Sequence, residues 1–131
     1  MAYVSIDGDD IGRLLTQRIY APDGDQTVEE FSDAVAGVFL SLATWVKAQG
    51  GRVLFCAGDS IAFKLDGVDT TAILDQLRES PFTVTVGVGD TLREAHWALN
   101  VAKSMGKNQV LHFEQVAADL FGRENRLKKD V

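Results

Sequence analysis

Residues 52–65 read RVLFCAGDSIAFKL, and two short β-prone runs flank the pair Gly58-Asp59 in this stretch. In the first run Val53 and Phe55 alternate with their neighbours, and the second run alternates in the same way. Two such runs joined by a Gly-Asp pair predict a tight antiparallel hairpin, because glycine supplies the positive φ that the turn requires. The hairpin would hold the carboxylate of Asp59 on a rigid tip. Aspartate is also common in turns for structural reasons, so the rest of the chain has to distinguish a functional from a structural Asp59.

The composition is that of a single globular domain. The 131 residues are 46% hydrophobic and 24% charged, which is enough apolar content for one core. The single cysteine, Cys56, and the lack of an N-terminal signal pattern predict a cytoplasmic protein. The longest apolar stretch, residues 34–46, is too short to span a bilayer, so we expect no direct membrane insertion. A net charge of −6 argues against duplex nucleic acid as a partner.

An acidic motif follows the first predicted strand, residues 3–6. Asp7, Asp9 and Asp10 lie within four residues, and their charges would repel one another without a cation. Carboxylate oxygens are ligands that suit Mg²⁺ or Mn²⁺. Asp9 or Asp10 could instead cap the helix that follows. Asp7 belongs to the strand end itself, and two strand-end carboxylates from separate segments are what a two-metal site requires.

Hydrophobic periodicity and turn signals predict the remaining elements. A capping box at residues 27–30 would begin a long amphipathic helix that ends at Gly50-Gly51, and another at residues 91–94 would begin a helix that ends near Gly106. The other predicted elements are helices at residues 11–19, 69–79 and 114–121, and strands at residues 82–89 and 108–113.

The predicted order of elements is β-α-α-β-β-α-β-α-β, which defines an α+β fold. Its centre is a ferredoxin-like βαββαβ unit with an added helix and an added edge strand. We expect one domain over residues 1–122 and a polar tail over residues 123–131. In this topology the second hairpin strand lies antiparallel to the first strand. The hairpin tip would therefore bring Asp59 close to Asp7.

Lys103 and Lys107 lie four residues apart near the end of the predicted helix over residues 91–105, so both side chains could point to the same side. Lysines also favour a helix C-terminus electrostatically, so the spacing alone leaves their role open.

Three motifs, in order along the chain, resemble those of a known group of enzymes. They are DGD at residues 7–9, AGDS at residues 57–60 and AHWALNVAKSMGKN at residues 95–108. Together they are similar to the palm-type nucleotidyl cyclases, which include the GGDEF diguanylate cyclases and the polymerase subunit of type III CRISPR complexes. By its length and its IDGDDIG stretch, the chain is identified as a member of the minimal CRISPR polymerase (mCpol) family. The resemblance covers residues 3–113.

The resemblance implies a two-metal catalytic site. Asp7 and Asp59 would hold two Mg²⁺ or Mn²⁺ ions, with the Gly8 carbonyl and Asp9 as further ligands. The palm families share metal-dependent attack of a ribose hydroxyl on an α-phosphate with loss of pyrophosphate. The chain departs from the family pattern at Ser60, where GGDEF and GGDD motifs carry an acid, and this makes a diguanylate cyclase a poorer match.

The resemblance also implies how nucleotides bind. Lys103 and Lys107 would bind the β- and γ-phosphates, Gly58 would let the triphosphate approach the hairpin, and Asn108 would join this nucleotide-binding group. The implied product is a cyclic di- or oligonucleotide made from NTPs, with ATP favoured. Because cyclising two nucleotides needs two palms, the resemblance implies a head-to-head homodimer. It also implies a role in antiviral signalling through an effector that binds the cyclic nucleotide.

Two other functions remain open at this point. The same palm could act as a GTP ring-opening hydrolase or a mononucleotide cyclase, which its product would reveal. The chain could instead be a nucleotide-binding sensor or assembly domain with a degenerate site, which would bind NTP without releasing pyrophosphate. Ser60 in place of an acid is the feature that favours the second alternative.

Overall fold

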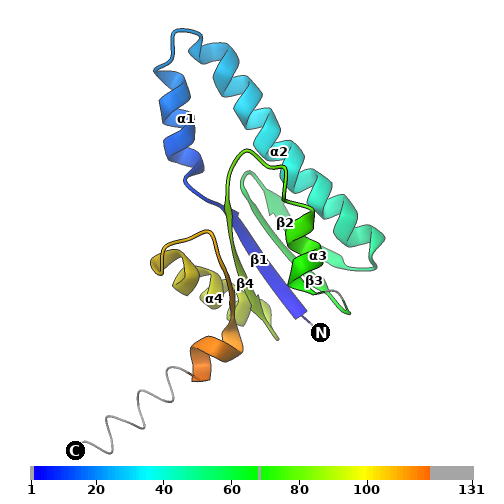
Figure 1. Ribbon diagram of the computed structural model, residues 1–131. Coiled ribbons are helices and arrows are strands. Elements are labelled where there is room, and N and C mark those ends of the chain that lie inside the picture. The colour runs from blue at the N-terminus through cyan, green and yellow to red at the C-terminus, as the bar shows by residue number, and fades with distance from the viewer. Residues whose placement is uncertain (1, 68, 119–131) are drawn as a thin grey trace, which may run out of the picture.

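A five-stranded sheet with the strand order β2-β3-β1-β4-β5 forms the centre of the molecule. The computed structural model of the chain describes residues 2–67 and 69–118 (Figure 1). Its elements are, in chain order, β1 (Ala2–Gly8), α1 (Ile11–Ile19), α2 (Gly24–Ala48), β2 (Arg52–Ala57), β3 (Ser60–Leu65), α3 (Thr70–Asp75), β4 (Val84–Gly89), α4 (Leu92–Ser104) and β5 (Val110–His112).

The strand pairing confirms the predicted α+β fold. β1 is antiparallel to both β3 and β4, and β2 is antiparallel to β3. These four strands, with α2 and α3 as connections, form the ferredoxin-like βαββαβ unit. The added helix is α1, which forms a helical hairpin with α2 (Figure 1). The added edge strand is β5, which is parallel to β4 and is reached through α4.

The long helix α2 provides much of the core on one face of the sheet. Its 25 residues are long and apolar enough to cross a membrane by length and composition alone. In this fold its apolar stripe packs against core residues of β1, β3 and β4, and the rings of Phe39 and Phe82 stack with centroids 5.9 Å apart. The buried residues of the stripe are Phe31, Val35, Phe39, Leu42, Ala43 and Val46.

The opposite face of the sheet is covered by α4, whose backbone lies directly on β4. A Cβ atom at Gly87 would lie 2.1 Å from the Ala95 carbonyl oxygen and 2.3 Å from the Leu99 nitrogen, so only glycine permits this approach. The predicted cap of α4 is confirmed, since the Thr91 hydroxyl accepts a 3.1 Å hydrogen bond from the Glu94 amide. This close packing fixes the direction of α4 and brings its last turn to the C-terminal end of β1.

The hairpin at residues 52–65 forms as predicted, but the alternation predicted for its first strand is wrong. The register of β2 against β3 shifts between Val53 and Phe55, which is a β-bulge. As a result Val53 and Cys56 both pack against the core, although they are three residues apart. Phe55 lies on the other side of the sheet and is 46% exposed.

Several predicted boundaries were also wrong. α2 begins at Gly24 with Asp23 as its N-cap, so the predicted capping box at residues 27–30 lies inside the helix. The Thr27 hydroxyl accordingly donates to carbonyl oxygens of the preceding turn, such as that of Gly24 at 3.2 Å. α3 ends at Asp75 and is followed by turns. Helical structure resumes at residues 113–118, and the predicted end of that helix and the predicted tail lie outside the described residues.

Candidate active site

The tip of the β2–β3 hairpin meets the C-terminal end of β1. Asp7 pairs with Ser60 across the two strands, and the Gly8 amide donates a 2.8 Å hydrogen bond to the Asp59 carbonyl oxygen. The predicted proximity of Asp59 and Asp7 follows from this register, because Asp59 is the residue next to the strand partner of Asp7. The two carboxylates therefore come from separate segments to the same end of the sheet.

A two-residue turn presents Asp59. Ala57 pairs with Ser60, Gly58 has a φ of 58°, and Asp59 has a negative φ. Glycine at the first central position with this φ pattern is typical of a type II′ hairpin turn. The Asp59 side chain is half-buried and makes no hydrogen bond or ion pair within the described parts of the chain. Its carboxylate is thus held in place by the backbone, and its oxygens are available for a ligand.

The carboxylate of Asp7 has two partners among the described residues. The Ser60 hydroxyl donates a 2.6 Å hydrogen bond to Oδ1, and the Lys103 ammonium forms an ion pair with Oδ2. The Asp7 side chain retains 20% exposure. Ser60, which stands where related motifs have an acid, therefore orients Asp7, and Lys103 brings a positive charge into the same site.

The second lysine is held by the way α4 ends. The Gly106 amide donates to the Lys103 carbonyl oxygen at 3.4 Å and the Lys107 amide to that of Ala102 at 3.2 Å, which is the hydrogen-bond pattern of a Schellman motif. Lys107 then has a φ of 61°, and its ammonium lies 2.7 Å from Oδ1 of Asp10. Lys103 and Lys107 thus reach two acids of the β1–α1 segment from the same helix end.

Asp10 occupies the N-cap position of α1, but its side chain makes no capping hydrogen bond. The hydrogen bond from Lys107 lowers the pKa of Asp10, and the charges of Lys107 and Arg13 add to this effect, whereas desolvation opposes it. Asp10 therefore stays ionised and serves as the partner of Lys107. Asp10 is therefore the N-cap residue by its backbone position, but it lacks the side-chain hydrogen bond of a capping residue.

Asp9 is buried, with 5% of its surface exposed, and both of its carboxylate oxygens are occupied by protein donors. Oδ1 accepts a 2.6 Å hydrogen bond from the Thr85 hydroxyl. Oδ2 accepts hydrogen bonds from the Thr83 hydroxyl at 2.7 Å and from the backbone amide of Asn108 at 3.0 Å. The sequence interpretation missed both threonines. Their alternation with valines was the available signal, since residues two apart in an extended segment point to the same side, here at the start of β4.

The donor atoms of the site fit a divalent cation that arrives with a nucleotide. Asp7 and Asp59 provide carboxylate oxygens, and Gly8, which follows Asp7, joins the two segments through the hydrogen bond from its amide to the Asp59 carbonyl oxygen. No group of three or more His, Cys, Asp or Glu residues that could hold a metal occurs among the described residues. Mg²⁺ is commonly held by one or two carboxylates together with substrate phosphates, and this is the arrangement that the two acids can support.

A cavity of about 370 Å³ adjoins Asp59. It lies between α1, α2 and the hairpin tip, and the residues that line it are mostly small or apolar, namely Ile11, Gly12, Leu15, Ser32, Val35, Ala36, Gly58 and Asp59. Cavities of this size and character are typical of small-molecule sites. An apolar group bound in it would lie next to the carboxylate at the hairpin tip.

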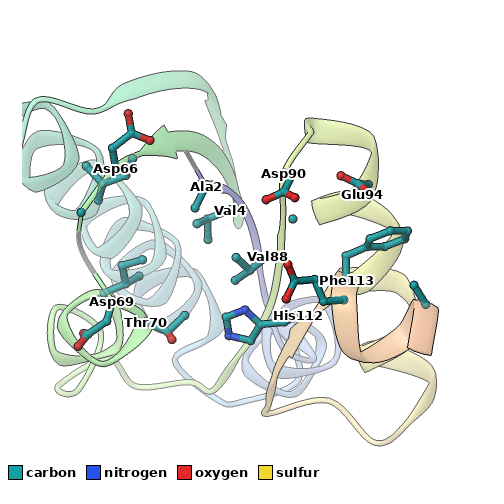
Figure 2. A pocket seen from close by; sticks show the side chains of 16 residues that line it. Ala2, Val4, Asp66, Asp69, Thr70, Val88, Asp90, Glu94, His112 and Phe113 are labelled. Carbon is teal, nitrogen blue, oxygen red and sulfur yellow. The ribbon is translucent and has the colours of Figure 1, made fainter. Parts of the chain in front are cut away.

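A larger cavity of about 510 Å³ lies at the opposite end of the sheet. Figure 2 shows Val4 and Val88 at its back, Asp69 on one side, and Asp90 and Glu94 on the other. These acids would repel phosphates, because no lysine or arginine is among the residues that line the cavity. The smaller cavity, by contrast, adjoins Asp59 at the end of the sheet where Asp7 and Lys103 also meet.

Two acids at the end of a central strand and at a neighbouring hairpin tip, faced by lysines from a helix end, define a palm-type domain of the nucleotide cyclase and polymerase class. The chain belongs to the minimal CRISPR polymerase (mCpol) family, whose domain profile matches residues 3–113. No curated protein sequence matches the chain.

Similar solved structures support the same fold. The GGDEF domain of DgcB from Caulobacter crescentus, in complex with c-di-GMP, has a TM-score of 0.57 at 17% identity, with 86% of this chain and 77% of that chain covered. The active GGEEF domain of a diguanylate cyclase from Vibrio cholerae has a TM-score of 0.55 at 20% identity, with 86% and 81% covered. The Csm1-Csm4 cassette in complex with cA4 has a TM-score of 0.55 at 20% identity, with 83% and 20% covered.

Proposed function

We propose that the protein is a metal-dependent nucleotidyltransferase that joins NTPs into a cyclic di- or oligonucleotide, with ATP as the favoured substrate. The observation that carries this proposal is the meeting of Asp7 with Asp59 at one end of the sheet, where the Asp59 carboxylate lacks a side-chain partner within the described residues. A binding domain without chemistry has no need to hold a second, unpaired carboxylate beside the first.

The proposed reaction forms one bond and breaks another. A ribose hydroxyl oxygen bonds to the α-phosphorus of an NTP, the bond from that phosphorus to the bridging oxygen of the β-phosphate breaks, and pyrophosphate leaves while the hydroxyl proton is lost to water. Divalent cations bound by Asp7 and Asp59 would lower the pKa of the hydroxyl and neutralise the developing charge. The turn at Gly58 and the hydrogen bond from Ser60 to Asp7 would fix the two carboxylates that hold these cations.

Both lysines would change partners when a nucleotide binds. Lys103 is paired with Asp7 and Lys107 with Asp10. A cation bound to Asp7 would replace the charge of Lys103, and the β- and γ-phosphates would then attract both ammonium groups. In such an exchange Asp7 would pass from Lys103 to a cation, while Asp10 would keep Arg13, 3.7 Å away, as a neighbouring positive charge.

The nucleobase is assigned to the cavity between α1 and α2. Its lining has no asparagine, glutamine or glutamate, and Asp59 at its edge is assigned to the cation. Guanine presents N–H donors that a specific site meets with carboxylate or amide acceptors, whereas an apolar cavity fits adenine with fewer polar partners. This lining supports ATP over GTP.

A single palm holds one activated triphosphate, so we propose that two chains face each other head to head and that each forms one of the phosphodiester bonds. The cytoplasmic location, the antiviral role and the downstream effector expected from the family belong to the same proposal. The presence of cA4 in the Csm1-Csm4 structure, one of the structural neighbours, supports a product of this kind.

The test is to incubate the purified protein with each NTP and either Mg²⁺ or Mn²⁺ and to identify the products by mass spectrometry. We expect a cyclic product from ATP that is lost in Asp59→Asn, a variant with nearly the same shape and no partner to lose among the described residues. Tight NTP binding without pyrophosphate release would support the sensor alternative, which Ser60 favours. A ring-opened or mononucleotide product would replace the proposal with the other enzyme.

A further inference from the structure

We propose that Asp9 is a positioning residue for the triphosphate and that it binds no metal. Its buried carboxylate fixes the turn at residues 106–108 and thereby holds Lys107 at the site. The inference rests on the proposed function for its consequence, namely triphosphate binding, but the contacts that carry it involve only the protein.

The burial and contacts of Asp9 differ from those of its acidic neighbours. Asp7 and Asp10 are both more exposed than Asp9, and both pair with lysines. Asp9 pairs with no lysine or arginine of the described residues. It receives hydrogen bonds from Thr83, just before β4, from Thr85 in β4, and from the backbone amide of Asn108. One carboxylate thus connects the β1–α1 segment, the start of β4 and the segment between α4 and β5.

The segment that Asp9 holds has an unusual backbone. Gly106, Lys107 and Asn108 have successive φ values of 120°, 61° and 49°. Two of these residues are not glycine, and such residues rarely adopt positive φ unless the surroundings impose it. The Asn108 amide points to Oδ2 of Asp9 and to the Thr85 hydroxyl oxygen, both at 3.0 Å, so these acceptors hold the segment in that conformation.

The same contacts argue against Asp9 as a metal ligand. The Asn108 amide can only donate, so it keeps its hydrogen directed at Oδ2, where a cation would have to replace it. The buried carboxylate would leave that amide without its charged acceptor if it turned toward a cation. Asp7 and Asp59 meet no such obstacle, since one retains exposure and the other has no side-chain partner among the described residues.

Lys107 is the residue through which Asp9 would act. It is the last residue of the Schellman motif and directly precedes Asn108, and its ammonium points back to Asp10 in the same β1–α1 segment. Release of the Asn108 amide would let the 106–108 turn relax, and the direction of the Lys107 side chain would be lost with it. Lys103 lies within α4 and would keep its position.

The decisive experiment is a double-mutant cycle on binding, read by calorimetry with a non-hydrolysable ATP analogue and with AMP, both in the presence of Mg²⁺. We expect Asp9→Asn and Lys107→Ala each to weaken binding of the analogue by about tenfold. Lys107→Ala removes a charge-assisted contact to the triphosphate, and Asp9→Asn removes the charged acceptor that holds the turn carrying Lys107. Binding of AMP should not change. The double variant should bind no more weakly than Lys107→Ala alone.

Two results would overturn the inference. The first is additive losses in the double variant. The second is a loss of Mn²⁺ affinity, measured without nucleotide, that is as large for Asp9→Asn as for Asp7→Asn, because this is the signature of a metal ligand. Thr83→Val provides a second variant that removes a donor to Oδ2 at an exposed position, in case Asp9→Asn does not fold.

Hydrogen exchange of backbone amides tests the same inference without a nucleotide. We expect the Asn108 amide to exchange at least about tenfold faster in Asp9→Asn, while the Gly8 amide, which bonds to the Asp59 carbonyl oxygen, stays unchanged as an internal control. Unchanged exchange at Asn108 would overturn the role of Asp9. A wild-type protein that binds no NTP would overturn the proposed function instead, and the exchange result would still decide on Asp9.

Discussion

At the residue scale, the site pairs charges that lie far apart in the sequence. Asp7 and Asp10 would repel each other and Asp9, but Lys103 and Lys107 come from 96 and 97 residues further along the chain to neutralise them. The pairs are partly exposed, so each contributes little to the stability of the fold. Under the proposed function their effect is on ligand binding, because Asp7 would have to leave Lys103 to hold a cation and both lysines would have to leave their acids to hold phosphates.

Removal of Lys103 should therefore have opposite effects on two ligands. In Lys103→Ala we expect Mn²⁺, measured without nucleotide, to bind a few-fold more tightly, because Asp7 no longer has a competing positive charge. Binding of an ATP analogue should weaken by about tenfold, because a phosphate contact is lost. Manganese titration followed by electron paramagnetic resonance, together with calorimetry on the analogue, measures both. Weaker Mn²⁺ binding in the variant would contradict the proposed exchange of partners.

The pair of Asp10 and Lys107 gives a pH prediction. The pKa of Asp10 is lowered chiefly by its hydrogen bond with Lys107, so in Lys107→Ala we expect the Asp10 pKa to rise toward its ordinary value. Because the folded pKa lies below the unfolded one, the pair stabilises the protein above about pH 4 and this contribution is lost as the pH falls through the lowered pKa. Carboxyl titration by NMR in the metal-free protein measures the shift. An Asp10 pKa that is the same in both proteins would contradict the assigned pairing.

The residues of the site were predictable from the sequence to different degrees. Asp7 and Asp59 could be placed together because β-strand topology alone fixes their register. The partners of Asp9 could not be found, because they depend on β4 lying next to β1 and on a turn after α4 that ends at Asn108. An acidic run indicates that its charges need partners, but the sequence does not show whether those partners are cations, lysines or hydroxyl groups.

At the scale of elements, the position of Lys103 depends on how closely α4 lies on β4. Gly87→Ala would place a methyl group 2.1 Å from the Ala95 carbonyl oxygen, so the helix would have to move. We expect the free energy of unfolding to fall by about 3 kcal/mol or more, as for overpacking against backbone. Nucleotide affinity should also fall, because Lys103 moves with the helix.

Gly37→Ala is the matched control for this change. Gly37 lies in the middle of α2, where an added Cβ atom would have no described atom outside its own helix turn within 4 Å, and its φ is not positive. The same substitution should therefore raise the free energy of unfolding by about 0.5–1 kcal/mol, because alanine restricts the unfolded chain and favours helix. Chemical denaturation measures both variants, and equal effects at the two positions would contradict the close packing of α4.

The order of elements was predicted correctly because hydrophobic periodicity and turn residues act locally. The errors arose where a neighbouring strand or helix determines the local register or boundary. The bulge in β2 is set by its pairing with β3, and it places Val53 and Cys56 on the core side against the simple alternation. α2 starts early at Gly24, where the chain passes so close to the end of α1 that a Cβ atom would lie 2.7 Å from the Ile19 carbonyl oxygen, and Thr27 lies inside the helix.

At the scale of the whole molecule, the site lies at one end of the sheet and is built from one set of acids and one pair of lysines. In the proposed reaction one such set would activate one triphosphate. A cyclic dinucleotide contains two phosphodiester bonds, and two copies related by a two-fold axis would present two identical sites to each other. The proposed dimer therefore predicts that the two bonds of one product are made by different chains.

Mixing wild-type protein with Asp59→Asn tests this division of labour. At equal amounts and random pairing, about one quarter of the dimers would have two intact sites, and about half would have one. We expect the cyclic product to fall to about one quarter of the wild-type yield. A linear dinucleotide triphosphate should accumulate, because a dimer with one intact site makes the first bond but not the second.

Asp75→Asn, which removes the same charge from an exposed position on α3 away from the site, provides the control and should leave both products unchanged. Mass spectrometry of the two products across a series of mixing ratios distinguishes the two mechanisms. If one chain closed the ring unaided, the cyclic product would fall in proportion to the wild-type fraction and no linear intermediate would appear. The curvature of the plot of cyclic-product yield against wild-type fraction thus reports how many intact sites the product needs, whichever base the protein selects.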